Sequence, residues 1–418
     1  MEQTSIRLPL ELFVKIIPFL DDRLIGKEEW EFSHSQRVSC DIPVCLFACS
    51  LVCHAWNDLC RPLIFRFIRI NCYEDIEHSA LWTLHSTRPY LCKYIRELRL
   101  FFSFEATPPL SDWIDACLGR FVNLRELELQ FWSELQAEVR SRLLPGITSM
   151  ISTTGLKRLA LQDWDTGLPS HLQLILFACS TTLEDLMVHF RSRGELPSTA
   201  PVAPSTVVRL AALRRLELYE PPASFARTVD IECPNLETFT ASYGGASYPW
   251  ELPSWLPESI SELNVKVTVK SGFPQLSWGP IHPSRLTFEF VQYNGDMTRI
   301  GEYVDRLPFL DHLRQLTIKS FSNQAQLFFP EPSRYEALYH FLQSLQRPTL
   351  SKRIIFIIQI RKQILDIADT ELESIRTREL ARLEEVFLPL KADGLSIQLV
   401  ALLFGGNVQR RVLMRCSV

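Results

Sequence analysis

The chain has 418 residues, of which 46% are hydrophobic and 22% are charged, and its formal net charge is −4. This composition is typical of a globular protein, and the length suggests two or three domains or one elongated repeat array. The small net charge and the lack of long blocks of like charge argue against a general electrostatic affinity for nucleic acid or an anionic membrane. The longest apolar runs, at 354–358 and 395–406, are too short to span a bilayer and indicate protein core.

Cysteine usage points to a reducing compartment. The eleven cysteines are scattered along the chain, and no Asn-x-Ser/Thr sequon occurs. Charged residues interrupt the apolar residues of the first segment, which argues against a secretory signal. We therefore expect free thiols and an intracellular protein of the cytoplasm or nucleus.

The first predicted element is a short helix near the N-terminus. In "IRLPLELFVKIIPFLDD" (6–22), apolar residues recur at helical spacing from Leu8 to Leu20. Pro9 suits the first turn, and Pro18 predicts an end or a kink. Residues 21–44 then form a polar insert.

A second apolar block follows the insert. In "LFACSLVCHAWNDLCRPLIFRFIRI" (46–70), an apolar stripe from Leu46 to Leu59 predicts a helix, and "RPLIF" begins a further short helix or turn. Three short helices in about 65 residues make a small core, so we expect a partner to cover the remaining apolar surface.

These two blocks resemble the F-box, in the form found in fungal proteins that carry leucine-rich repeats. The matching features are the L-P-x-E-L start, the C-S-L-V-C-x-x-W stretch and the R-P-x-x-F tail. The resemblance implies docking on the adaptor subunit of a cullin-RING ubiquitin ligase. It further implies that first-helix residues contact the adaptor, whereas Leu51, Trp56 and Leu59 belong to the three-helix core or its rim. The implied adaptor contacts are Leu8, Pro9, Leu12, Ile16 and Ile17.

A nine-residue phrase recurs after the second block, as in "NLRELELQF" (123–131) and "ALRRLELYE" (212–220). Its alternation predicts a strand with one buried face, and helical spacing between phrases predicts return helices. The phrases recur every 23–32 residues, which favours a solenoid with a parallel sheet over a doubly wound α/β domain, because alternate positions are charged. Their central apolar positions are Ile68, Leu98, Leu127, Leu159, Leu186, Leu216, Phe239, Leu263, Leu286 and Leu316.

The phrase resembles the leucine-rich repeat, although its asparagine position is filled by other residues throughout. We therefore expect an α/β solenoid of irregular curvature. After residue 350 the period breaks, and helical spacing over 361–387 predicts a C-terminal helical cap. The expected domains are an F-box over 1–65 with its insert at 21–44, a repeat solenoid over 66–350 and a cap over 351–418.

Residues that flank the central apolar positions should project from the open face of the sheet. Aromatic and other apolar members are the expected anchors for a protein target, because such residues dominate interface energetics. A merely solvated sheet face is the alternative for each of them. The expected target-binding residues are Phe101, Gln130, Met187, His189 and Tyr219.

Signs of catalysis are weak in this sequence. Cys45, Cys49 and Cys53 share one helical face, but no second ligand pair accompanies them, so core packing is favoured over a zinc site. No nucleophile-elbow, Walker or zinc-protease motif occurs, so no cofactor is expected.

Together with the resemblance to the F-box and the leucine-rich repeat, this predicts a non-catalytic substrate receptor of a cullin-RING ligase. The alternatives are a repeat scaffold that acts outside ubiquitin ligation and an enzyme whose site is assembled from distant residues.

Overall fold

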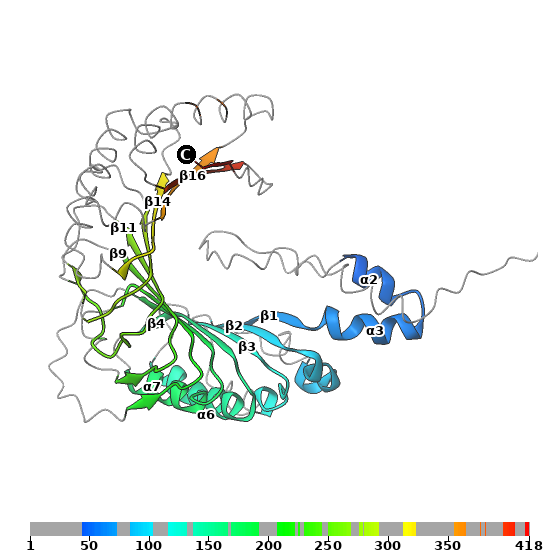
Figure 1. Cartoon of the computed structure of the whole chain (residues 1–418). Helices are drawn as coiled ribbons and strands as arrows, with labels where there is room; N and C mark the ends of the chain where they lie inside the picture. The colour runs from blue at the N-terminus through cyan, green and yellow to red at the C-terminus, as the bar shows by residue number, and fades with distance from the viewer. Residues whose placement is uncertain are drawn as a thin grey trace, which may run out of the picture. The chain divides into compact units, whose positions relative to one another are not determined.

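The computed structural model divides the chain into two compact units (Figure 1). Unit 1 comprises residues 1–164 and 170–183, and unit 2 comprises residues 165–169 and 184–418. The structure describes residues 44–72, 84–102, 116–131, 137–165, 169–191, 207–221, 225, 230–244, 250–268, 276–278, 280–291, 312–322, 355–364, 377, 381, 396–405 and 414–417.

Unit 1 begins, in its described part, with two short helices. These are α2 (Val44–Ser50) and α3 (His54–Ile64), which pack through Leu46, Cys60 and Ile64. The sequence predicted one apolar stripe across this stretch, and that prediction is wrong. The α2 helix ends in turn bonds from Leu51 N to Ala48 O (3.2 Å) and from Val52 N to Cys49 O (3.1 Å), so the two halves of the stripe do not share one face.

Four parallel strands follow in unit 1, in the order β1 (Phe67–Cys72), β2 (Glu97–Phe102), β3 (Glu126–Phe131) and β4 (Arg158–Asp165). A 3-10 helix, η4 (Pro89–Tyr94), precedes β2. The helix α6 (Ala137–Thr153) connects β3 to β4, and α7 (Pro169–Ala178) follows β4. Figure 1 shows α6 and α7 on the same side of these strands.

Unit 2 contains a second run of parallel strands, which are paired in the order given by their numbers. They are β5 (Asp185–Arg191), β7 (Arg215–Tyr219), β9 (Thr238–Gly244), β11 (Glu262–Thr268), β13 (Arg285–Val291), β14 (Gln315–Ser322), β15 (Ile355–Ile364) and β16 (Ser396–Gly405). The last strand, β17 (Met414–Ser417), pairs with β16 in the antiparallel direction.

The predicted register of the repeats is confirmed within each unit. In unit 1, Ile68, Leu98, Leu127 and Leu159 are successive register partners. In unit 2 the same alignment joins Leu186, Leu216, Phe239, Leu263, Leu286 and Leu316. From Leu98 onward these side chains are buried, which is expected where one face of each strand packs on the core.

Most residues that connect the unit 2 strands lie outside the described ones, so the predicted return helices stay a prediction there. Among the described connecting residues, Phe225, Thr377 and Ala381 are helical. Short strands in these connections also form two small parallel pairs. One joins β6 (Val208–Arg209) to β8 (Ile231–Glu232), and the other joins β10 (Trp250–Glu251) to β12 (Leu276–Ser277).

The sheet also continues beyond the predicted end of the repeats. Residues 355–364, expected to open the helical cap, form strand β15, and Phe356 is the register partner of Leu316. The isoleucine-rich sequence "IFIIQIRKQI" explains the difference, because β-branched residues favour an extended chain. Of the predicted helix over 361–387, the structure describes residues 361–364, which belong to β15, and Thr377 and Ala381, which are helical; the rest lies outside the described residues.

Aromatic side chains fill the core at the carboxyl ends of the unit 1 strands. The rings of Phe102 and Phe131 stack with centroids 5.3 Å apart, and Trp164 meets Phe131 edge-on at 5.6 Å. All three side chains are buried. The chain is thus a mixed α/β protein in which a large parallel sheet is buried on one face.

Candidate functional site

The first candidate surface lies on the α2–α3 hairpin. Three large apolar side chains at the end of α2 remain exposed: Phe47 by 49%, Leu51 by 72% and Val52 by 66%. We call these three residues the α2 patch. The residues expected to contact an adaptor, at positions 8, 9, 12, 16 and 17, lie outside the described residues.

The second candidate surface is the polar face of the unit 1 sheet, which we call the unit 1 face. It is formed by the side chains that alternate with the buried ones. They are Phe67, Arg69, Glu97, Arg99, Phe101, Glu126, Glu128, Gln130, Arg158 and Gln162.

Ion pairs join neighbouring strands across the unit 1 face. Arg99 Nε lies 2.8 Å from Glu128 Oε2, and Arg158 Nη1 lies 3.7 Å from Glu126 Oε1. Gln162 Nε2 donates to Glu128 Oε1 at 2.7 Å. Each contact joins adjacent strands, so pairing of the backbones holds the interacting groups in place.

Like Glu97 on the same face, Glu128 has a buried side chain, with an exposed fraction of 6%. Burial raises the pKa of its carboxyl group, and the nearby charges of Arg99 and Arg69 oppose that rise. The sequence predicted a solvated position here. The prediction is wrong because side chains from both neighbouring strands cover the carboxylate.

Arginine and phenylalanine alternate at the β1–β2 side of the same face. The Arg69 guanidinium lies 4.1 Å from the centroid of the Phe101 ring, and the Arg99 guanidinium lies 5.0 Å from that of Phe67. Such contacts fix both partners and leave a planar, cationic surface with apolar edges. This arrangement suits a protein segment that carries carboxylates beside apolar side chains.

Gln130 is positioned by an unusual stretch of β4. Its Nε2 donates to Asp163 Oδ2 at 3.1 Å. Asp163 has a φ of 55°, in the left-handed region, which aspartate tolerates better than most residues. Phe101 and Gln130 are register partners, so two of the expected target-binding residues are adjacent on the unit 1 face.

The other three expected residues lie on the corresponding face of unit 2. His189 and Tyr219 are register partners whose rings meet edge-on at 6.0 Å. Tyr219 Oη donates to Glu217 Oε2 at 3.0 Å. Met187 is only 8% exposed, so it offers less surface than the sequence suggested.

Polar contacts continue along the unit 2 face. Asn264 Nδ2 donates to Thr240 Oγ1 at 3.3 Å and to Glu262 Oε1 at 3.2 Å, and Lys266 Nζ lies 3.1 Å from Glu289 Oε1. Burial raises the pKa of the Glu217 carboxyl group, and the hydrogen bond from Tyr219 opposes that rise.

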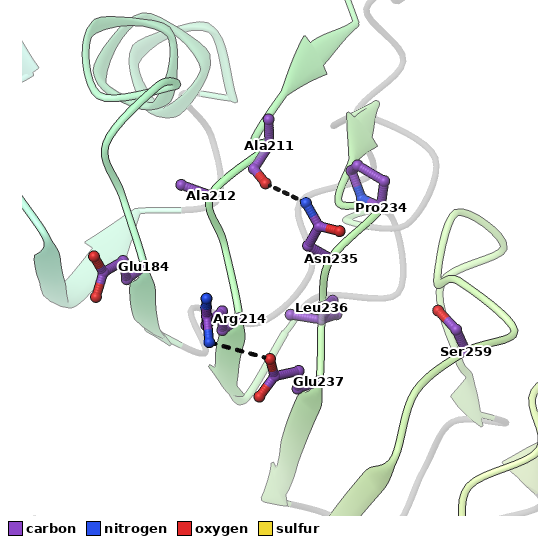
Figure 2. Close-up of a pocket in the computed structure, with 9 residues that line it drawn as sticks. All are labelled: Glu184, Ala211, Ala212, Arg214, Pro234, Asn235, Leu236, Glu237 and Ser259. Atoms are coloured by element: carbon purple, nitrogen blue, oxygen red, sulfur yellow. Dashed lines mark hydrogen bonds and ion pairs between the residues drawn. The ribbon is translucent and has the colours of Figure 1, made fainter.

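A shallow depression lies at the amino ends of the unit 2 strands (Figure 2). Figure 2 shows two contacts across it: Asn235 Nδ2 donates to Ala211 O at 2.8 Å, and Arg214 Nη1 pairs with Glu237 Oε1 at 3.4 Å. Its lining includes no histidine or cysteine, and the ion pair is exposed.

The described part of the chain contains no group of three or more His, Cys, Asp or Glu side chains placed to hold a metal ion. Cys45 and Cys53 are exposed, and Cys49 is half-buried. None of the described helices has the length and apolar character needed to cross a membrane.

Sequence reasoning missed two contributors to the unit 1 face, Arg69 and Phe67. Both flank Ile68, in the phrase "IFRFIRIN" that begins the repeats. Their same-face position could have been inferred from the register of Ile68 with Leu98, but their contacts with β2 side chains depend on rotamers.

Comparison with protein-family models gives no match, and a search of curated proteins also finds no matching protein.

Proposed function

We propose that this chain is a non-catalytic substrate receptor of a cullin-RING ubiquitin ligase. In this proposal the N-terminal helices dock on the adaptor subunit, and the polar faces of the parallel strands hold a protein target. The receptor would raise the effective concentration of a target lysine near the ubiquitin-loaded enzyme, so it needs no nucleophile of its own.

Adaptor docking is supported by the α2 patch. Phe47, Leu51 and Val52 expose large apolar side chains close together in sequence. Large apolar side chains exposed in one short segment are consistent with a protein interface at this segment. The resemblance of residues 1–70 to the F-box implies that the partner at this patch is the adaptor subunit of the ligase.

Target binding is supported by the unit 1 face, and this face is the observation that carries the proposal. It combines aromatic rings and guanidinium groups, which are enriched at protein interfaces. Its ion pairs and cation–π contacts hold the side chains before binding, which lowers the entropy cost of association.

A binding experiment tests the adaptor claim. Leu51→Asp with Val52→Asp should reduce capture of the purified adaptor at least tenfold in a pull-down, because the charges would have to be buried at the interface. Pro9→Ala with Leu12→Asp should have the same effect. Val122→Asp with Val207→Asp is the matched control, since both valines are also exposed. Undiminished capture by the α2 variant would refute docking through this patch.

Target capture requires a separate experiment. Phe101→Glu with Tyr219→Glu should remove proteins from the set found by proximity labelling, whereas Val122→Glu with Val207→Glu should leave that set unchanged. An identical set for the first variant would refute target binding through these faces.

A second candidate function is a protein-interaction scaffold that acts outside ubiquitin ligation. The same α2 patch and the same polar faces support it. Ubiquitination of a captured target by the reconstituted complex separates the two functions, because only the receptor requires transfer.

A further inference from the structure

A row of basic residues runs along the amino ends of the unit 1 strands. Arg66, Arg96, Arg125 and Lys157 each immediately precede the first residue of β1, β2, β3 and β4, respectively. We call these four residues the basic ladder. The predicted target-binding residues do not include them.

Backbone hydrogen bonds join the four residues directly. Arg96 N donates to Arg66 O at 2.9 Å, Arg125 N donates to Arg96 O at 2.8 Å, and Lys157 N donates to Arg125 O at 2.8 Å. Adjacent strands lie about 4.8 Å apart, so the ladder places four cations along about 14 Å. The side chains of Arg96, Arg125 and Lys157 are exposed.

Two carboxylates lie beside the ladder in sequence, and both contact cations. Glu97 Oε1 accepts from Arg66 Nε at 3.0 Å, and Glu126 pairs with Arg158 on the neighbouring strand. Arg125 Nη1 donates to Gly155 O at 3.0 Å, a neutral acceptor that orients the guanidinium without cancelling its charge. The ladder therefore keeps a surplus of positive charge, which Arg96 and Arg125 carry at its centre.

The equivalent ladder in unit 2 has a different character. The residues that precede β5, β7, β9, β11, β13 and β14 are Glu184, Arg214, Glu237, Ser261, Ser284 and Arg314. Here a cation and an anion occupy neighbouring positions and pair, as Arg214 does with Glu237 at 3.4 Å. The uniform charge in unit 1 is thus not a requirement of the repeat itself.

We propose that the basic ladder binds an acidic segment of a partner protein. An extended peptide rises about 3.3 Å per residue, so about five residues span the ladder. Arginine pairs with carboxylates through two parallel hydrogen bonds, which suits glutamate and aspartate side chains. Positive charge confined to this length would also steer an acidic partner toward unit 1.

Charge distribution favours a short acidic peptide over nucleic acid. The positive charge of the ladder is confined to about 14 Å, and the whole chain carries a net charge of −4. A long polyanion that extended past the ladder would lie against a chain of net negative charge, whereas a short segment would not. The inference does not depend on the ligase proposal, because none of the four ladder residues belongs to the α2 patch or to the unit 1 face.

The test uses the full chain and a fluorescein-labelled peptide of eight glutamates. Fluorescence anisotropy should detect binding at an ionic strength of about 0.05 M, and binding should weaken steeply with added salt. Arg96→Glu with Arg125→Glu and Lys157→Glu should weaken it more than tenfold. The matched control is Arg209→Glu with Arg214→Glu and Arg314→Glu, three exposed residues of unit 2 with the same total charge change, which should alter affinity less than twofold.

Three results would overturn the proposal: no binding by the wild-type chain, equal loss in both triple variants, or tighter binding of a single-stranded oligonucleotide of equal charge through the same residues. Circular dichroism and thermal unfolding establish that each variant is folded. If the charge-reversal variant does not fold, the triple glutamine variant at positions 96, 125 and 157 replaces it, and undiminished peptide binding by that variant would equally refute the proposal.

Discussion

Arg99 on β2 and Glu128 on β3 are register partners, and Arg99 Nε lies 2.8 Å from Glu128 Oε2. The other carboxylate oxygen accepts a hydrogen bond from Gln162 on β4. The buried carboxylate therefore joins three consecutive strands across the unit 1 face. Removing one partner of such a buried group costs more than the contact itself contributes, because the remaining charge stays desolvated.

The raised pKa of Glu128 predicts a pH dependence of stability. A carboxyl group with a raised pKa binds its proton more tightly in the folded state, so its effect on stability is unfavourable at neutral pH and disappears as the pH falls toward the ordinary value. Relative to Glu128→Gln, the wild-type chain should gain unfolding free energy between about pH 7 and about pH 5. Urea unfolding at several pH values measures the stability of both chains, and a wild-type chain that loses unfolding free energy relative to Glu128→Gln on acidification would contradict the assignment.

Removal of the Tyr219 hydroxyl should weaken unit 2 through Glu217. Tyr219→Phe leaves the half-buried carboxylate of Glu217 without the donor that lies 3.0 Å away, which should cost about 1 kcal/mol at neutral pH. The same substitution in a Glu217→Gln background should cost less, because a neutral amide needs that donor less. Equal costs in both backgrounds would show that the hydrogen bond does not couple the two residues.

The repeats were predictable because each strand has a period of two with one apolar face. That pattern alone aligned Leu98 with Leu127 and Leu216 with Phe239, as the structure confirms. It also placed Phe101 beside Gln130, because register fixes which same-face residues are adjacent.

Other features depend on more than one strand and were not predictable. Burial of Glu128 requires side chains from β2 and β4, and burial of Met187 likewise depends on neighbouring strands. The extended conformation of residues 361–364 was missed because a helical period and an isoleucine-rich strand both fit a short apolar run. The break between α2 and α3 was missed because an apolar stripe carries no information about turn bonds at Leu51 and Val52.

The aromatic core of unit 1 predicts a large cost for a cavity at Phe131. Its ring stacks on Phe102 and meets Trp164 edge-on, so Phe131→Ala should reduce the free energy of unfolding by about 3–5 kcal/mol. Phe131→Leu should cost less, since it retains most of the volume. Val122→Ala, at an exposed position, should change stability by no more than about 0.5 kcal/mol. A loss for Phe131→Ala within that small range would show that the ring is not packed as described.

Exposed cysteines should react with a thiol reagent in the folded chain, whereas buried cysteines should not. Burial raises the pKa of Cys179 and of Cys233 to about 12, so almost no thiolate forms at about pH 8. Cys45 lies in the first turn of α2 and is exposed. Cys53 immediately precedes α3 and is also exposed. Iodoacetamide should therefore label Cys45 and Cys53 in the folded chain, as peptide mass spectrometry can measure.

The same labelling experiment also tests the packing of the two buried thiols. Cys179 Sγ donates to Ile175 O at 3.3 Å, which ties it to the preceding turn of α7. Cys179 and Cys233 should become labelled only when denaturant unfolds the part of the chain that buries them. Labelling of either residue in the folded protein at the rate of Cys45 would contradict its burial, because neither access nor thiolate would then be limiting.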